Sequence, residues 1–158
     1  MLHHMPILKR VAPTFSLPAD DGTVVSLNAL RGHTVVLYFY PKDDTPGCTQ
    51  QACDLRDTFP RFAKSDAIIL GISPDTVKSH AKFRKKYALP FTLLADTEHS
   101  VCEAYGVWQQ KRLFGHRYMG VVRSTFIVDA KGKLVRQFLK VSHEGHADLV
   151  DAALRELA

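Results

Sequence analysis

Two continuous apolar segments constrain the fold of this chain more than any other feature of its sequence. Residues 34–40 and 67–72 are rich in β-branched, aromatic and aliphatic side chains, without the polar alternation of a half-exposed strand. Such runs are typical of strands that are covered on both faces. Between them, apolar residues recur at helical spacing. The members of this stripe are Cys48, Ala52, Leu55, Phe59 and Phe62. The order strand, helix, strand favours an α/β fold.

Turn and helix-breaking signals indicate where neighbouring elements end. Residues 15–17 and 23–27 predict an N-terminal β-hairpin, because the Asp-Gly pair between them, Asp21 and Gly22, is a strong turn signal. Pro60 falls inside the helical stripe. A proline there removes a backbone N–H and clashes with the preceding turn, so we expect the helix to kink or end early.

Capping signals place the elements of the second half. We expect Asp75 to cap a helix that ends at Tyr87, and Asp96 or Thr97 to cap a third helix around residues 101–105. Two strands at 124–129 and 134–139 and a helix over 146–157 follow. The pattern predicts an α/β sandwich, with a mixed central sheet flanked by helices on both faces and an N-terminal β-hairpin.

Length and cysteine content limit the class of protein. The 158 residues match one domain, so we expect residues 1–158 to form a single domain that needs no crosslinks to fold. Three cysteines are too few, and odd in number, for a fully paired disulfide framework. We therefore expect a reducing compartment, the cytoplasm. Residues 1–11 contain no apolar region of signal-peptide length, and we base no argument on His3 and His4.

The net charge of +5 raises the question of nucleic acid or anionic membranes as partners. Basic residues are locally dense only at 82–86 and 111–117, and no aromatic-interleaved recognition motif accompanies them. No apolar segment approaches the ~20 residues of a membrane-spanning helix. We expect solvated basic faces, with no nucleic-acid partner and no membrane partner.

The loop at residues 40–47 carries the strongest chemical signal, because it leaves a buried strand and opens a helix near Cys48. Ligand sites in open α/β sheets lie beyond the carboxyl ends of strands. Unpaired N–H groups and the macrodipole at a helix N-terminus stabilise a thiolate, so we expect Cys48 to be partly ionised at neutral pH. The alternative is that Cys48 is only a small apolar residue that begins the stripe.

A second cysteine, Cys53, follows five residues later. Helical geometry places it about 140° around the helix from Cys48, with the two Cα atoms about 8.6 Å apart. That exceeds the ~7 Å limit for a disulfide, so the two can bond only if the first turns of the helix unwind. The C-x4-C spacing fits neither a zinc site nor a C-x-x-C disulfide exchanger, and we expect no metal and no cofactor.

The series Pro41-x-x-x-Thr45-x-x-Cys48 resembles the P-x-x-x-T-x-x-C signature of peroxiredoxins. Residues 38–57, 71–75, 105–108, 118–120 and 123–129 are also similar to the bacterioferritin comigratory protein, or peroxiredoxin Q, branch of that family. The resemblance spans essentially the whole chain. It implies a thioredoxin-like fold and the reduction of hydrogen peroxide and organic hydroperoxides by a thiol.

The resemblance also implies roles for five residues. Cys48 corresponds to the peroxidatic cysteine and Cys53 to the resolving cysteine of an atypical two-cysteine enzyme. Thr45 corresponds to the hydroxyl that binds thiolate and peroxide, Pro41 to the residue that shields the site from water, and Arg123 to the guanidinium that stabilises negative charge. Thioredoxin or a glutaredoxin-type dithiol would recycle such an enzyme. Resolution within one chain needs no second subunit, so we expect a monomer.

Other interpretations of individual residues remain open at the level of sequence. Thr45 can simply cap the helix, and Arg123 can form a surface ion pair. Cys102 has no partner motif, and we expect it to pack in the core. A non-catalytic redox sensor or binding module is the alternative to an enzyme. We expect His143 at the surface, and three aromatic residues in the core rather than in a wall beside the site: Phe91, Trp108 and Phe114.

Overall fold

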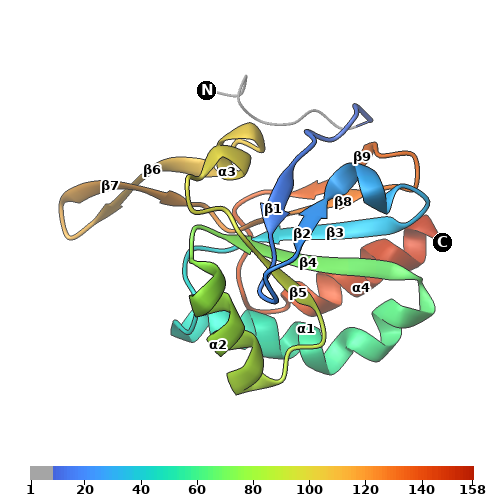
Figure 1. The fold of residues 1–158 in the computed structure, drawn as a ribbon, viewed down its shortest axis with the longest axis horizontal. Helices are drawn as coiled ribbons and strands as arrows, with labels where there is room; N and C mark the ends of the chain where they lie inside the picture. Colours follow the sequence, from blue (N-terminus) through green and yellow to red (C-terminus); the bar gives the residue numbers. More distant parts are fainter. Residues whose placement is uncertain (1–8) are drawn as a thin grey trace.

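Five strands form the central sheet of the computed structural model, which describes residues 9–158. In spatial order they are β5 (Thr92–Ala95), β4 (Ala67–Ser73), β3 (Thr34–Phe39), β8 (Ser124–Val128) and β9 (Leu134–Phe138). β3 pairs in parallel with β4 and antiparallel with β8, which makes the sheet mixed (Figure 1). The expectation that residues 1–11 carry no signal peptide falls mainly on residues outside those described.

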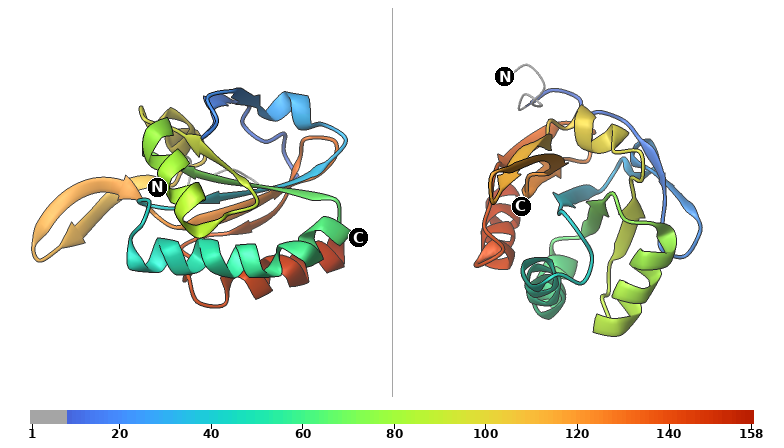
Figure 2. Two further views of the ribbon diagram at one scale, coloured as in Figure 1. Left: turned by 60° about the horizontal axis from the view of Figure 1, so that its bottom comes forward. Right: turned by 90° about the vertical axis from the view of Figure 1, so that its left-hand side faces the viewer.

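Successive side chains of the sheet strands pack into two separate hydrophobic cores, one on each face. From β3, Val36 and Tyr38 point to one core and Val35 and Leu37 to the other, as the two-residue period of a strand requires. The first core lies under α1 (Pro46–Lys64), α2 (Val77–Tyr87) and α4 (His146–Leu157). The second lies under β1 (Ser16–Pro18), β2 (Val24–Ser26), the 3-10 helix η2 (Leu27–Leu30) and α3 (Ser100–Ala104) (Figure 2). The predicted α/β sandwich with its N-terminal hairpin is confirmed.

Of the two outcomes predicted for Pro60, a kink or an early end of α1, the early end is wrong, because the helix continues to Lys64. Pro60 lacks the N–H that would bond to the carbonyl of Arg56 four residues earlier, which is a local loss. Leu55 and Phe62, one on each side of it, are fully buried in the core beneath the helix. Burial of this stripe keeps the chain helical across the proline.

Two capping predictions need correction. Thr76, not Asp75, is the N-cap of α2, and its hydroxyl accepts the backbone N–H of Ser79 at 3.1 Å. The N-cap residue of α3 is His99, not Asp96. The Asp96 carboxylate nevertheless accepts the N–H of Cys102 at 2.8 Å, so it satisfies a free donor in the first turn of α3 although it lies before the helix. Asp75 is left for another role, described below.

A protruding hairpin was not predicted. β6 (Trp108–Leu113) and β7 (His116–Val121) pair only with each other and extend away from the body of the molecule (left panel of Figure 2). Phe114 at its tip is 92% exposed, so the prediction of core packing is wrong for this residue. Phe91 is buried as predicted, and the half-buried Trp108 stacks on His99. Within residues 9–158, no helix is long and apolar enough to cross a bilayer.

Candidate active site

Cys48 lies in the first turn of α1, just beyond the carboxyl end of β3. Its side chain is 3% exposed and belongs to the core beneath α1. The N–H groups of a first helical turn have no partner within the helix, and they carry partial positive charge. The Cys48 sulfur therefore lies at the electropositive end of α1.

Arg123 brings a full positive charge to the same sulfur. It lies between β7 and β8, and its Nη2 donates to Sγ of Cys48 at 3.3 Å. Its Nη1 donates to Oε1 of Gln51, a fully buried residue one turn further along α1. Arg123 therefore faces the thiol, and Gln51 fixes the plane of the guanidinium. Sequence patterns did not single out Gln51, because only the fold places it beside Arg123.

Thr45 is the N-cap residue of α1, but its side chain makes no capping hydrogen bond. Its hydroxyl instead donates to the carbonyl of Lys42 at 2.8 Å. The interpretation of Thr45 as a capping side chain is therefore wrong. Because the hydroxyl proton is bonded to the Lys42 carbonyl, the Thr45 oxygen is left with lone pairs that can accept a hydrogen bond. Among the described residues, no hydrogen bond joins Thr45 to Cys48.

The first turn of α1 is tightly packed against the residues around Arg123. A Cβ added to Gly47 would lie 3.1 Å from Nδ1 of His143 and 3.4 Å from Nη2 of Arg123. His143 is one-third exposed, at 33%, so it is a surface residue as predicted, but one that borders the site. Pro41 is half-buried in the loop before the helix. A methyl group at position 47 would therefore require the His143 ring to move by a few tenths of an ångström.

Cys53 lies on a different side of α1 from Cys48, as helical spacing predicts. It is partly exposed and lines an open groove of about 480 Å³ together with Asp44, Thr49 and Tyr87. Partial burial raises the pKa of the Cys53 thiol above its ordinary value, as do Asp57 and Asp54, while Arg56 opposes them. All three cysteines are unpaired thiols, and α1 is an intact helix across Cys48 and Cys53. The structure therefore does not bring these two sulfurs together.

Cys102 belongs to the other core, on the opposite face of the sheet. It is fully buried in α3, as predicted. Burial, and next to it the charge of Asp96, raises the pKa of this thiol far above its ordinary value. A neutral thiol behind the sheet cannot reach Cys48 without disruption of the core.

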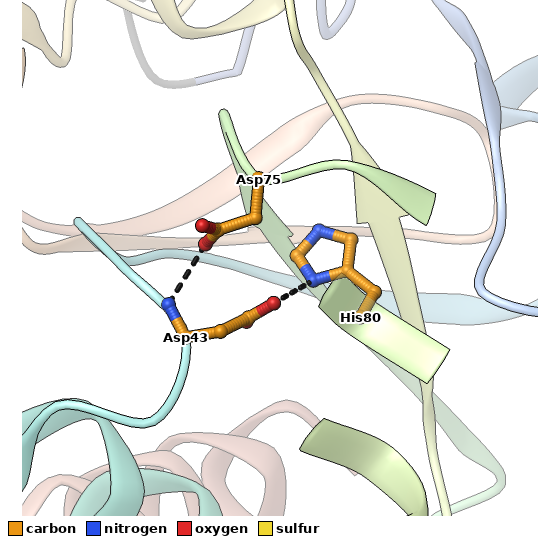
Figure 3. A group of neighbouring side chains, drawn as sticks. All are labelled: Asp43, Asp75 and His80. Carbon is orange, nitrogen blue, oxygen red and sulfur yellow. Dashed lines mark hydrogen bonds and ion pairs between the residues drawn. The ribbon is translucent and has the colours of Figure 1, made fainter. Parts of the chain in front are cut away.

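A buried polar network, which local sequence patterns did not indicate, holds the loop that precedes Cys48. The backbone N–H of Asp43 donates to Oδ2 of Asp75 at 2.8 Å, and the Asp43 carboxylate meets Nδ1 of His80 at 2.7 Å (Figure 3). Tyr40 donates its hydroxyl to the same carboxylate. Ser79 of α2 does likewise, at 2.8 Å. These hydrogen bonds connect the loop before Cys48 to α2.

Asp43, Asp75 and His80 are close enough together to suggest a metal site. However, Oδ2 of Asp43 and Nδ1 of His80 already bond to each other, and Oδ2 of Asp75 accepts the backbone N–H of Asp43. Nε2 of His80 contacts the carbonyl oxygen of Leu94 at 3.0 Å. Both ring nitrogens of His80 thus already have oxygen partners. A metal ion would have to displace these bonds, so the residues fit a structural hydrogen-bond network better than a coordination sphere.

Comparisons with known proteins agree with this geometry. The AhpC/TSA family matches residues 8–137. The chain is 50% identical over 135 residues to a putative peroxiredoxin bcp of Coxiella burnetii, covering 85% of this chain and 89% of that protein. It is 46% identical over 147 residues to peroxiredoxin Bcp of Bacillus subtilis, covering 93% of this chain and 94% of that one.

A solved structure points to the same relatives. The bacterioferritin comigratory protein of Xanthomonas campestris, studied for its alkyl peroxide reduction activity, superposes with a TM-score of 0.86 and 41% identity, over 90% of this chain and 91% of that chain. A thiol paired with a guanidinium at a helix N-terminus is the arrangement that such chemistry requires. The chain therefore belongs to the AhpC/TSA family, in its bacterioferritin comigratory protein or peroxiredoxin Q branch, and is a thiol-dependent peroxidase.

Proposed function

We propose that Cys48 is the residue that attacks the peroxide. Its thiolate forms a bond to one peroxide oxygen while the O–O bond breaks and the other oxygen leaves as water or an alcohol after taking up a proton. Cys48 becomes a sulfenic acid. The observation that carries this proposal is the 3.3 Å contact of Arg123 with the Cys48 sulfur at the start of α1.

Three other groups support the attack. Backbone N–H groups of the first turn and the Arg123 guanidinium donate toward the oxygen on which negative charge grows. The Thr45 hydroxyl donates its own proton to the Lys42 carbonyl, so its oxygen is suited to accept a hydrogen bond from the O–H of the incoming hydroperoxide. Pro41 at the loop shields the sulfur from water. Hydrogen peroxide and organic hydroperoxides both fit this scheme, because only the O–O–H group needs recognition.

Cys53 is the resolving cysteine in this proposal. Its thiol attacks the sulfenic acid sulfur of Cys48, a disulfide forms and water leaves. The raised pKa of Cys53 supports a division of roles, because a mainly protonated thiol competes poorly for peroxide. The first turns of α1 must unwind for the two sulfurs to meet. Cys102 is unsuited to this role, because it lies behind the sheet.

An external dithiol, thioredoxin or a glutaredoxin-type protein, completes the cycle. The groove beside Cys53 leaves its sulfur open to attack from outside. Since both cysteines belong to one helix, catalysis needs no second subunit, and we assign a monomer of one domain, residues 1–158. Three unpaired thiols suit a reducing compartment, the cytoplasm.

Two variants test the assignment. Replacing Cys48 with Ser should abolish peroxide-dependent oxidation of thioredoxin, and retained turnover would overturn it. Replacing Cys53 with Ser should leave the first peroxide reaction intact and slow steady-state recycling by thioredoxin. Unchanged recycling would remove Cys53 from the mechanism.

The alternative is a redox sensor whose disulfide switches a partner surface. Rapid mixing of the reduced protein with peroxide and a dithiol separates the two functions. Repeated fast turnover identifies an enzyme, whereas a single slow oxidation identifies a sensor.

A further inference from the structure

The hairpin of β6 and β7 ends in an exposed apolar tip. Phe114 is 92% and Leu113 is 55% exposed, and behind them Met119 and Tyr118 are 49% and 44% exposed. Leu113 and Phe114 are neighbours at the tip, whereas Tyr118 and Met119 are consecutive residues of β7 and lie on opposite faces of the hairpin. Exposed apolar side chains scattered singly are ordinary, but two adjacent ones at the end of a protruding hairpin concentrate apolar surface where a partner can contact it.

The conformation of the tip makes its sequence unusual. Leu113 pairs with His116, so Phe114 and Gly115 form a two-residue turn, with φ angles of +50° and +79°. Two positive φ angles define a type I′ turn, in which Asn or Asp is favoured at the first position. A bulky aromatic residue is strained there. The chain thus places an apolar ring in solvent at a position that neither the turn nor the core requires.

The charge of the hairpin points to an anionic partner. No acidic residue occurs between Glu103 and Asp129. Arg112 and Arg117 face each other across the strands directly behind the tip. Neither takes part in any ion pair found among residues 9–158. Two guanidinium groups directly behind the apolar tip, those of Arg112 and Arg117, are therefore available to an outside ligand.

We propose that this hairpin anchors the protein peripherally to an anionic lipid bilayer, with Phe114 and Leu113 inserted at the interface and Arg112 and Arg117 at the headgroups. Interfacial membrane anchors combine apolar side chains that enter the bilayer with basic side chains that lie at the level of the headgroups. Nucleic acid would use the cations but would leave Leu113 and Met119 without a role. The proposal replaces the expectation that the chain has no membrane partner, which rested on the lack of a membrane-spanning segment and on the scatter of the basic residues.

The position of the hairpin gives this anchor a consequence for the site. β7 ends at Val121, two residues before Arg123, so the base of the hairpin adjoins the active site. Six residues of strand span about 20 Å. A protein held by its tip would keep Cys48 about that far from the bilayer surface.

Sedimentation with lipid vesicles tests the proposal on the full, reduced chain. Vesicles of 70% phosphatidylcholine and 30% phosphatidylglycerol should bind the protein at least tenfold more tightly than pure phosphatidylcholine, and added salt should weaken this binding. Equal binding to both vesicles, or binding to neither, would overturn the proposal. The readout does not involve catalysis, so its failure would leave the peroxidase assignment untouched.

Variants of the tip separate insertion from folding. Phe114→Asn supplies the residue that a type I′ turn favours, so it should fold at least as well, yet bind anionic vesicles roughly tenfold more weakly or worse. Val24→Asn removes another exposed apolar side chain, 68% exposed on β2, and serves as the matched control with binding within twofold of the parent. Binding by Phe114→Asn that equals the control would refute insertion.

Charge variants test the two arginines. Arg112→Gln combined with Arg117→Gln should weaken binding about 25-fold, at about fivefold for each cation. The control, Lys82→Gln with Lys85→Gln, removes the same charge from α2 and should change binding less than twofold. Tighter binding of a single-stranded oligonucleotide than of vesicles, unaffected by Phe114→Asn, would identify nucleic acid as the partner instead. A dimer that dissociates in Phe114→Asn would identify a second copy of the chain.

Discussion

Replacing Arg123 with Met should slow the reaction of Cys48 with peroxide by about 10- to 150-fold. The guanidinium contacts the sulfur at 3.3 Å, where two unit charges attract by about 5 kcal/mol at an effective dielectric constant of about 20. Water that enters the emptied space restores part of this attraction energy. The net loss on removing one partner of a charged hydrogen bond is therefore smaller, about 1.5–3 kcal/mol. Each 1.36 kcal/mol is tenfold in rate, which gives the stated range.

Single-turnover kinetics measure this effect directly. The reduced protein is mixed with peroxide at several concentrations, and the second-order rate of Cys48 oxidation is compared with that of the parent. Arg123→Lys keeps the charge but cannot contact both Cys48 and Gln51, so it should fall between the parent and Arg123→Met. A rate for Arg123→Met within twofold of the parent would refute the role of the guanidinium.

Three further predictions follow from the same region. Gly47→Ala should slow Cys48 oxidation several-fold in single-turnover kinetics, because its methyl group would displace His143 or Arg123; an unchanged rate would contradict the close packing. Burial, with the charge of Arg123, lowers the pKa of His146 to about 4 from 6.5, so the unfolded chain binds the extra proton below pH 6.5. The free energy of unfolding, measured with urea, should therefore fall by about 3 kcal/mol from pH 7 to pH 4, and by much less in His146→Leu. Since the pKa of Cys53 is raised, disulfide formation after oxidation of Cys48 should still accelerate above pH 8, and a plateau below pH 8 would argue against this.

Residues close in sequence could be predicted, because their geometry follows from one helix. The spacing of Cys48 and Cys53 predicts one buried and one more accessible sulfur, and the structure shows that difference in exposure. The buried strands were predictable for a similar reason, since continuous apolar runs are local. The bounds of α4, His146–Leu157, match the predicted range. Arg123 was found through the resemblance to peroxiredoxins, not through any local pattern.

Contacts between distant parts of the chain could not be predicted. The bond between Asp43 and His80 joins residues 37 positions apart, and no periodicity reveals it. Asp75 was misassigned as a helix cap because the sequence does not show that the loop of Asp43 passes beside it. The β6 and β7 hairpin was missed for a different reason: both its faces are largely exposed, so it has no buried stripe that a hydrophobic pattern could detect.

Intact mass after one equivalent of peroxide tests the central claim most directly. The claim predicts a loss of two mass units and a peptide map that joins Cys48 to Cys53, with Cys102 still a free thiol. Cys53→Ser treated in the same way should instead carry a sulfenic acid on Cys48, which a sulfenate-trapping reagent captures. A disulfide that includes Cys102, or a parent protein that retains only a sulfenic acid on Cys48, would contradict resolution within α1.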